Sequence, residues 1–414
     1  MTEQPAVTCG IDWSERHHDV ALVGPNGRLV AKGRISDDVE RFTVLVGMLA
    51  DAGDSDANPI PVAIETPRGL LVAALRAAGR RVYAINPMAV ARYRERWTVA
   101  RSKSDHADAV VLANILRTDA HAHRPLPADS ELAQAITVLA RAHQDATWRR
   151  TKVVQELRAH LREYYPGFLK AFAAAGVTNL ASADARAVLA IAPTPAAGAR
   201  LNAARISAAL RRGERRRHID QTAADLRNAL RQPRLRQPAL VEAAMGTQTL
   251  ALLDALEAAC AGVDRLGTAL ADTFPKHPDY AVITSFPGLA DVTGARVLAE
   301  VGDDRSRFAD ARAIKAYAGS APVTRASGRS HVVIHRRIKN DRLAATGYAW
   351  AFMAMTNNPS ARAHYRHRKT LGDRHAAALR HLFNRMLGQL YHCLQTDQSY
   401  DDNLAFPAAI SPAA

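Results

Sequence analysis

The sequence predicts an α/β domain followed by an all-α region: a mixed sheet with helices, a central coiled coil and a mostly helical C-terminal part. In residues 1–125, short β-prone runs alternate with helical ones in the order βββαβαβα, whereas the later residues carry long helical periodicities. The 414 residues are 48% hydrophobic, which suffices for more than one core. We expect an α/β domain over 1–125, a helical coiled-coil region over 126–275, a C-terminal domain over 276–400 and a tail over 401–414.

The N-terminal strands are predicted from short apolar runs bounded by turn residues. Between two of these runs, Asn26-Gly27 favours a tight hairpin turn. Helical spacing follows at Phe42, Leu45 and Leu49, before the next compact strand. The expected strands are 7–13, 19–24, 28–35, 61–65 and 81–87, with a helix over 69–79 and two further helical runs before the Pro-rich residues 122–130.

Four carboxylates stand where this element order can bring them together. Asp12 ends the first strand, Glu65 ends the fourth, and Asp105 and Asp108 open a helix, in which residues i and i+3 share a face. Clustered carboxylates repel one another unless a divalent cation supplies the missing charge. Magnesium prefers oxygen ligands, and two ions roughly 3.5–4 Å apart can act on a phosphodiester. We therefore predict a Mg²⁺ site, with Mn²⁺ as the other candidate ion, and Lys103 beside it as a phosphate contact.

Each of these acids also has a simpler interpretation. Asp105 alone can be a helix N-terminal acid favoured by the helix dipole, Asp12 a turn residue and Glu65 an exposed strand end. A single D-x-x-D pair is weak evidence. Their joint placement on two strand ends and one helix favours metal-dependent nuclease chemistry.

The charge of the chain indicates a polyanionic partner. Lys and Arg number 55 against 40 Asp and Glu, a net charge of +15, so nucleic acid is the leading partner. Five arginines lie within residues 211–217, and we expect Arg215, Arg216 and Arg217 to contact phosphates, although such a run can also be a solvated face. We predict no membrane span, no disulfide and a cytoplasmic, nucleoid-associated location.

Two heptad-like seams mark the middle of the chain. The first runs from Leu132 to Tyr164 and the second from Leu252 to Leu270, with residues four and three apart. Three polar residues, His143, Arg150 and His160, interrupt the first seam. The members of the second are Leu252, Leu256, Ala259, Val263, Leu266 and Leu270. This spacing predicts a coiled coil that is folded back on itself or shared between chains. An intramolecular helical bundle is the alternative.

A serine with basic neighbours marks the C-terminal part. Ser327-Gly328 stands between Arg325 and Arg329, with Arg336 and Arg337 downstream. Glycine permits close approach, and arginine forks fit phosphate oxygens, so this serine faces an anion. No triad-like His/Asp pair surrounds it, and serine needs a base or metal to become a nucleophile. Ser-Gly is also ordinary turn chemistry, and Ser320, Thr324 and Ser330 are nearby rivals.

The motifs together resemble a known family. "GIDWSERHHDVALV", "AIETPRGLL", "RSKSDHADAVVLANIL", "SFPGLADVTGARVLAEVGD" and "YAGSAPVTRASGRS" are similar to the DEDD transposases of insertion-sequence family one-hundred-and-ten, relatives of the Piv invertases. The resemblance covers about residues 7–397. It implies an N-terminal RuvC-like domain of the RNase H fold, with a metal-binding tetrad of Asp12, Glu65, Asp105 and Asp108, and a C-terminal transposase domain with Ser327 as nucleophile.

The resemblance also implies the activity and the partners. It implies a Mg²⁺-dependent recombinase that joins element ends to target DNA through a serine ester, guided by a structured RNA from its own element. It favours a homo-oligomer, a dimer or a tetramer. Two other functions remain open at this point: a RuvC-like endonuclease that hydrolyses DNA junctions with the four acids alone, and a non-catalytic basic nucleic-acid scaffold.

Overall fold

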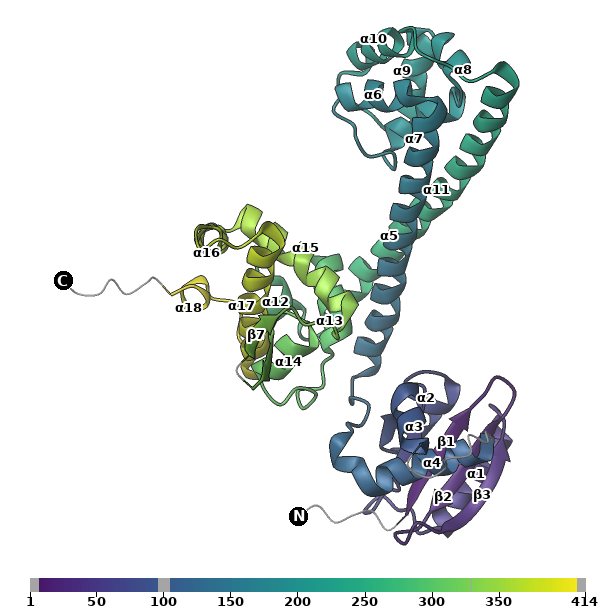
Figure 1. The fold of residues 1–414 in the computed structure, drawn as a ribbon, viewed down its shortest axis with the longest axis vertical. Coiled ribbons are helices and arrows are strands. Elements are labelled where there is room, and N and C mark those ends of the chain that lie inside the picture. Colours follow the sequence, from purple (N-terminus) through teal and green to yellow (C-terminus); the bar gives the residue numbers. More distant parts are fainter. Residues whose placement is uncertain (1–6, 96–104, 329, 408–414) are drawn as a thin grey trace, which may run out of the picture. The chain divides into compact units, whose positions relative to one another are not determined.

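The computed structural model describes residues 7–95, 105–328 and 330–407, without the side chains of residues 105, 106 and 330. It divides the chain into two compact units, Met1–Ala128 and Asp129–Ala414. Each unit is considered by itself below. Figure 1 gives the element labels used from here on.

The first unit is a five-stranded mixed sheet with helices. Its elements are β1 (Thr8–Trp13), β2 (His18–Val23), β3 (Leu29–Ile35), α1 (Val39–Asp51), β4 (Val62–Ile64), α2 (Leu70–Ala77), β5 (Val82–Ala84), α3 (Pro87–Arg94), α4 (Asp105–Asp119) and the 3₁₀ turn η1 (Ala120–Ala122). The strand order is β3-β2-β1-β4-β5, with β1, β2 and β3 antiparallel and β1, β4 and β5 parallel. The predicted α/β class and element order are confirmed, with the RNase H-like strand order.

Two apolar clusters lie on the two faces of this sheet. On one face, α1 and α2 pack against alternate strand residues such as Ile11 and Ile64. On the other face, Ala63 packs with Leu112 and other apolar residues of α3 and α4. Because strand side chains alternate between faces, residues one position after Ile11 and Ile64 belong to the face that carries α4.

The second unit is built on two long helices, α5 (Glu131–Tyr164) and α11 (Ala239–Thr273), which run antiparallel and pack on each other within one chain (Figure 1). Of the two coiled-coil arrangements left open by the sequence, the fold-back arrangement is present. The buried stripe of α11 was predicted in part wrongly: Leu256, Val263 and Leu270 are buried as expected, but Leu253 and Cys260 occupy the positions expected for Leu252 and Ala259.

The buried stripe lies on the side of α11 that faces α5. A Cβ atom on Gly267 would lie 3.6 Å from His143 Nε2, an ordinary contact distance, so this position belongs to the same side. Continuing at heptad spacing from Gly267 gives Val263, Cys260, Leu256 and Leu253. By length and composition alone, Ala239–Lys276 is also apolar enough to cross a membrane. That test is weak evidence here, because the buried stripe of α11 packs along α5.

Between the long helices the chain forms a small helical region with its own core. It contains α6 (Pro166–Ala174), α7 (Ala183–Ile191), α8 (Pro195–Ala199), α9 (Ala203–Arg212) and α10 (Ile219–Leu230). Phe168 and Phe172 stack at the centre, with ring centroids 4.6 Å apart.

The C-terminal part of this unit packs around Trp350 and Phe286. Its elements are η2 (Phe274–Lys276), α12 (Tyr280–Thr284), α13 (Asp291–Val301), α14 (Ala311–Tyr317), β6 (Val323–Ser327), β7 (Ser330–Ile334), α15 (Asp341–Asn357), α16 (Pro359–Thr370), α17 (His375–Thr396) and α18 (Asp402–Ala405). The predicted apolar face of α17 is confirmed by the burial of Leu379, Leu382 and Met386. All three cysteines are buried and unpaired, as expected.

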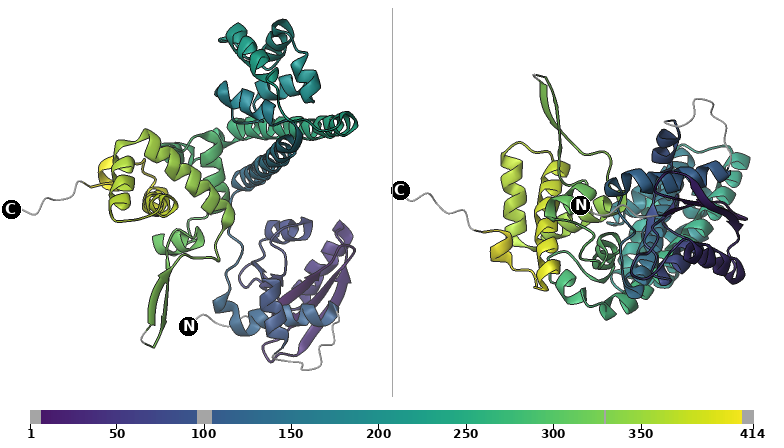
Figure 2. Two further views of the ribbon diagram at one scale, coloured as in Figure 1. Left: turned by 45° about the horizontal axis from the view of Figure 1, so that its top comes forward. Right: turned by 90° about the horizontal axis from the view of Figure 1, so that it is seen from below.

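One element of this part projects from the helices. Figure 2 shows β6 and β7 as a two-stranded hairpin that extends away from α14 to α17. Val332 and Val333 on it are 49% and 58% exposed. An isolated hairpin is marginally stable in water, so its base must be held by the helices from which it extends.

Candidate active site

The register of β1 and β4 places two predicted carboxylates side by side. Ile11 pairs with Ile64 in the parallel ladder, so Asp12 and Glu65 follow directly at the carboxyl ends of adjacent strands. Neighbouring strands lie about 4.8 Å apart. Both acids are half-buried and both belong to the face that carries α4.

The packing of α4 on β1 determines which helix residues lie near these acids. The Thr8 hydroxyl donates a hydrogen bond to the Ala113 carbonyl oxygen at 2.9 Å. A Cβ atom on Gly10 would lie 2.0 Å from the Ala109 carbonyl oxygen. Two residues forward along β1 therefore correspond to about one turn back along α4. Two more residues forward, at Asp12, correspond to the turn of α4 that begins at Asp105.

Glycine at position 10 makes this contact possible. Only a residue without a side chain lets the helix backbone approach the strand so closely. Its partner in the parallel register is Ala63, another small residue on the same face. The small residues of the sheet thus bring the first turn of α4, with Asp105 and Asp108, toward the strand ends that carry Asp12 and Glu65.

Asp108 is buried, with 4% of the residue exposed. Arg94 at the end of α3 places its Nη2 atom 2.5 Å from Asp108 Oδ1. The pair is poorly aligned, because Oδ1 has no hydrogen-bond partner and neither has the Arg94 Nε atom. A buried carboxylate needs a positive charge beside it, and Arg94 supplies one here. A bound metal cation near Asp108 would supply the same kind of compensation.

The described side chains do not by themselves form a complete metal site. Among them, no three His, Cys, Asp or Glu groups are close enough to hold an ion. The Asp105 side chain is outside that part of the structure, and so is the whole of Lys103. The role of these two residues stays a prediction. Arg94 was not singled out from the sequence, since the α3–α4 packing that brings it to Asp108 leaves no spacing signal.

Ser327 is exposed at the end of β6. It pairs with Ser330 across the turn, where Gly328 has φ of +54°. Within the described part of the hairpin, no side chain hydrogen-bonds the Ser327 hydroxyl. Arg329 and the side chain of Ser330 lie outside the described residues, so the expectation that this serine has no local base stays a prediction.

The predicted phosphate-contacting arginines have different surroundings. Arg325, Arg337, Arg216 and Arg217 are exposed, and Arg329 lies outside the described residues. Arg336 is half-buried, with an Nε atom that lacks a hydrogen-bond partner. Arg215 instead forms an ion pair with Asp184, at 2.6 Å, in the small helical region. Arg215 thus has a structural contact beside the predicted role.

Comparison with known proteins gives two family matches. Residues 9–166 match a family model described as a transposase, which spans Asp12, Glu65, Asp105 and Asp108. Residues 280–366 match a model described as "Transposase IS116/IS110/IS902 family", which spans Ser327.

Curated relatives match over nearly the whole chain. The "Mini-circle putative transposase for IS117" of Streptomyces coelicolor is 58% identical over 408 residues, which cover 99% of this chain and 98% of that protein. The "Insertion element IS900 uncharacterized 42 kDa protein" of Mycobacterium paratuberculosis is 28% identical, with 99% of each chain covered. The "Insertion element IS110 uncharacterized 43.6 kDa protein" of Streptomyces coelicolor is 26% identical, over 100% of this chain and 99% of that one.

Proposed function

Because this chain belongs to the IS110 family of transposases, we propose that it cuts and rejoins DNA with the carboxylates of its N-terminal sheet and a serine of its C-terminal hairpin. The family assignment makes it a phosphoryl-transfer enzyme of an insertion element. The observation that carries the finer proposal is the register of β1 and β4, with Asp12 and Glu65 adjacent beside the first turn of α4. Membership of a transposase family speaks against the non-catalytic scaffold.

The metal-binding role falls to Asp12, Glu65, Asp105 and Asp108. All four offer oxygen ligands, which suit Mg²⁺, and Mn²⁺ is the other candidate. Bound divalent ions would stabilise charge on the attacking and leaving oxygens of a phosphodiester. The burial of Asp108 next to a positive charge, here that of Arg94, supports this assignment, because a carboxylate is kept in a buried position only where a cation can balance it.

In the proposed reaction, Ser327 attacks a DNA phosphorus atom. The bond from Oγ to phosphorus forms while the bond from phosphorus to one deoxyribose oxygen breaks, and the serine proton passes to a base or to water. The released sugar hydroxyl of a second strand then attacks the ester and frees Ser327. The ester keeps the energy of the broken linkage, so no nucleotide cofactor is needed. The phosphates of the DNA would be held by basic side chains: Lys103, Arg325, Arg329, Arg336, Arg337, Arg216 and Arg217.

Ser327 and the four acids belong to different units of the chain. The proposed chemistry therefore requires both units to meet on the DNA, within one chain or between two copies. The family resemblance favours an oligomer. The family resemblance adds a guide RNA and a cytoplasmic location. Isolation of the protein from cells that carry the element, followed by sequencing of bound RNA, tests the guide.

The experiment that tests the function looks for a covalent adduct. The full chain is incubated with Mg²⁺ and DNA that carries the element ends, then denatured and separated. We expect strands attached to the wild-type protein and none attached to Ser327→Ala. Thr324→Ala, three residues earlier on the exposed hairpin, serves as the matched control and should keep the adduct. Asp12→Asn and Glu65→Gln should abolish strand cleavage altogether.

Two outcomes would change the proposal. Free nicked DNA produced by Ser327→Ala at the wild-type rate would support the hydrolytic endonuclease in place of the serine ester. Loss of the adduct in Thr324→Ala or Ser330→Ala, with Ser327→Ala unaffected, would move the nucleophile to that residue. Cleavage that persists in Asp12→Asn and Glu65→Gln would remove the metal-site assignment.

A further inference from the structure

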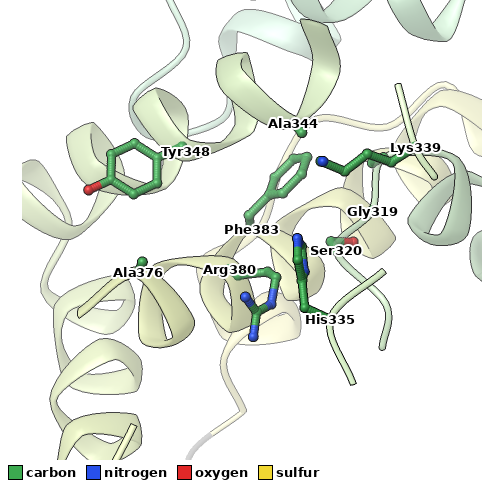
Figure 3. A pocket seen from close by; sticks show the side chains of 10 residues that line it. Gly319, Ser320, His335, Lys339, Ala344, Tyr348, Ala376, Arg380 and Phe383 are labelled. Carbon is green, nitrogen blue, oxygen red and sulfur yellow. The ribbon is translucent and has the colours of Figure 1, made fainter. Parts of the chain in front are cut away.

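A cavity of about 180 Å³ lies at the base of the β6–β7 hairpin (Figure 3). Four segments line it: the turn after α14, the residues that follow β7, one side of α15 and the first turns of α17. Ser320 lies three residues before β6 begins, and His335 follows directly after β7 ends. The cavity thus borders both strands that carry the Ser327 turn. Its lining residues are Ala318, Gly319, Ser320, His335, Lys339, Ala344, Tyr348, Ala376, Arg380 and Phe383.

The lining is cationic and contains no carboxylate. Lys339, His335 and Arg380 supply the positive charge: in Figure 3, His335 and Arg380 lie next to each other, and Lys339 points toward the Phe383 ring. Lys339 is paired at 2.9 Å with Asp341, whose side chain is 82% exposed. Arg380 is half-buried, and in the described part of the chain it forms no hydrogen bond or ion pair. Burial, and then the charges of Arg380 and Lys339, lower the pKa of His335. Positive charge is therefore in excess here.

The polar lining is held in place by its surroundings. Gly319 has φ of +71°, and a Cβ atom there would lie 2.2 Å from Lys339 Cδ, so the glycine leaves room for the lysine stem. The Ser320 hydroxyl donates a hydrogen bond to Asn384 Oδ1 at 3.0 Å. A preorganised set of donors loses less freedom when it binds an anion than flexible surface lysines do.

The other lining residues are mostly apolar. Phe383 is 3% exposed and packs its ring against Gly347, where even a methyl group would not fit. Ala344 and Ala376 add small surfaces, and Tyr348 lies at the edge with 46% exposed. A lining that combines cations with apolar and aromatic groups matches the two parts of a nucleotide, the phosphate and the sugar with its base.

We propose that this cavity binds one nucleotide of an unpaired DNA strand, with its phosphate between Lys339 and Arg380 and its sugar and base against the apolar lining residues. The inference rests on the proposed function, because the bound nucleotide would belong to the DNA strand that Ser327 attacks. A nucleotide can reach such a cavity only after its base has left the duplex stack. The site would fix the scissile strand at the root of the hairpin that attacks it.

The test is a binding measurement on the full chain in EDTA. A fluorescein-labelled oligothymidylate of 12 nucleotides is the probe, and its duplex with oligodeoxyadenylate is the comparison. We expect Arg380→Gln and Lys339→Gln each to weaken single-strand binding about tenfold, with a smaller effect on the duplex. Arg374→Gln, an exposed position that precedes the same helix, removes the same charge outside the cavity and should change binding less than about twofold.

A second pair of variants leaves the charge unchanged. Ala376 lines the cavity and is exposed, so Ala376→Phe would block the opening without disturbing the core. It should also weaken single-strand binding about tenfold, whereas Ala345→Phe, at an exposed position beside the lining residue Ala344, should not. No loss with Ala376→Phe, or equal losses with Arg380→Gln and Arg374→Gln, would overturn the proposal.

Two further arms identify the ligand. Displacement of the oligothymidylate by equimolar inorganic phosphate would mean that the cavity binds free anions and would overturn the nucleotide assignment. Tighter binding of oligouridylate, lost in Arg380→Gln, would assign the cavity to RNA and overturn the DNA proposal. Because binding is measured in EDTA, a failure of the serine-ester hypothesis would appear only in the adduct experiment.

Discussion

Replacement of Gly10 by alanine gives a direct test of how the carboxylates are brought together. The added methyl carbon would lie 2.0 Å from the Ala109 carbonyl oxygen and 2.4 Å from the Ala113 nitrogen. Ordinary contacts to carbon are about 3.5–4.0 Å long, so α4 must retreat from β1 by roughly 1–1.5 Å. Both obstructing atoms belong to helix backbone, and no side chain can rotate to relieve the contact.

The expected loss of stability is large for a single methyl group. Overpacking a core costs about 1–3 kcal/mol, and occasionally more. Since α4 buries Leu112 and Leu116 against the sheet, we expect about 3 kcal/mol for Gly10→Ala. Gly47→Ala is the matched control: Gly47 is exposed inside α1 with nothing within 4 Å of its added Cβ. That change should stabilise α1 by about 0.5–1 kcal/mol.

Hydrogen exchange of the amides in α4, followed by mass spectrometry on the full chain, measures the difference. A loss of about 3 kcal/mol should speed exchange about 100-fold in Gly10→Ala, while Gly47→Ala should protect α1. DNA cleavage should fall about 100-fold in Gly10→Ala, because a displacement of about 1 Å misplaces Asp105 and Asp108. Unchanged exchange in α4, or wild-type cleavage with α4 loosened, would refute the reasoning.

Three further predictions follow from buried charges. Burial and the Arg296 charge lower the pKa of His143 to about 4, whereas an unfolded histidine titrates near about 6.5. Between pH values of about 4 and 6.5 the unfolded chain therefore binds more protons than the folded one, so the thermal stability should fall as the pH drops through this range. In His143→Gln the stability should fall less steeply over the same range. Glu300 accepts hydrogen bonds from Arg141 at 2.8 and 2.9 Å. In urea unfolding, Glu300→Gln should lower the stability of the second unit by about 3 kcal/mol, because it leaves Arg141 without its charge partner. The control Asp341→Asn removes an exposed carboxylate and should cost less than about 0.5 kcal/mol. Arg94→Gln should bind Mn²⁺ severalfold more tightly by calorimetry, because it removes the cation beside Asp108, and Arg92→Gln should not.

The strand ends that carry Asp12 and Glu65 were predictable because local pattern and position agree. Short continuous apolar runs define these strands, because helices cover both faces of the sheet. The first and fourth strands are neighbours in the sheet. Gly10 carried a signal that could have been used, since a glycine inside an apolar strand often marks a close backbone approach.

Other parts of the site could not be predicted from spacing. The contact of Arg94 with Asp108 depends on how α3 packs on α4. The cavity beneath the hairpin collects residues from Ala318 to Phe383, which only the folded C-terminal part brings together. The stripe of α11 was ambiguous because alanines and leucines surround most of that helix. The folded structure buries Leu253 and Cys260 instead of Leu252 and Ala259.

The proposed metal site and the proposed nucleophile stand on parts of the fold that differ in rigidity. Asp12 and Glu65 end strands whose preceding residues, Ile11 and Ile64, are completely buried, so their backbone positions can hardly change. Ser327 stands on a hairpin that exposes most of its side chains. A metal site needs fixed ligands, whereas a nucleophile that must leave one strand and meet another gains from a movable support. The cationic cavity at the root of the hairpin then has a physical purpose, because it would hold the strand while the serine moves.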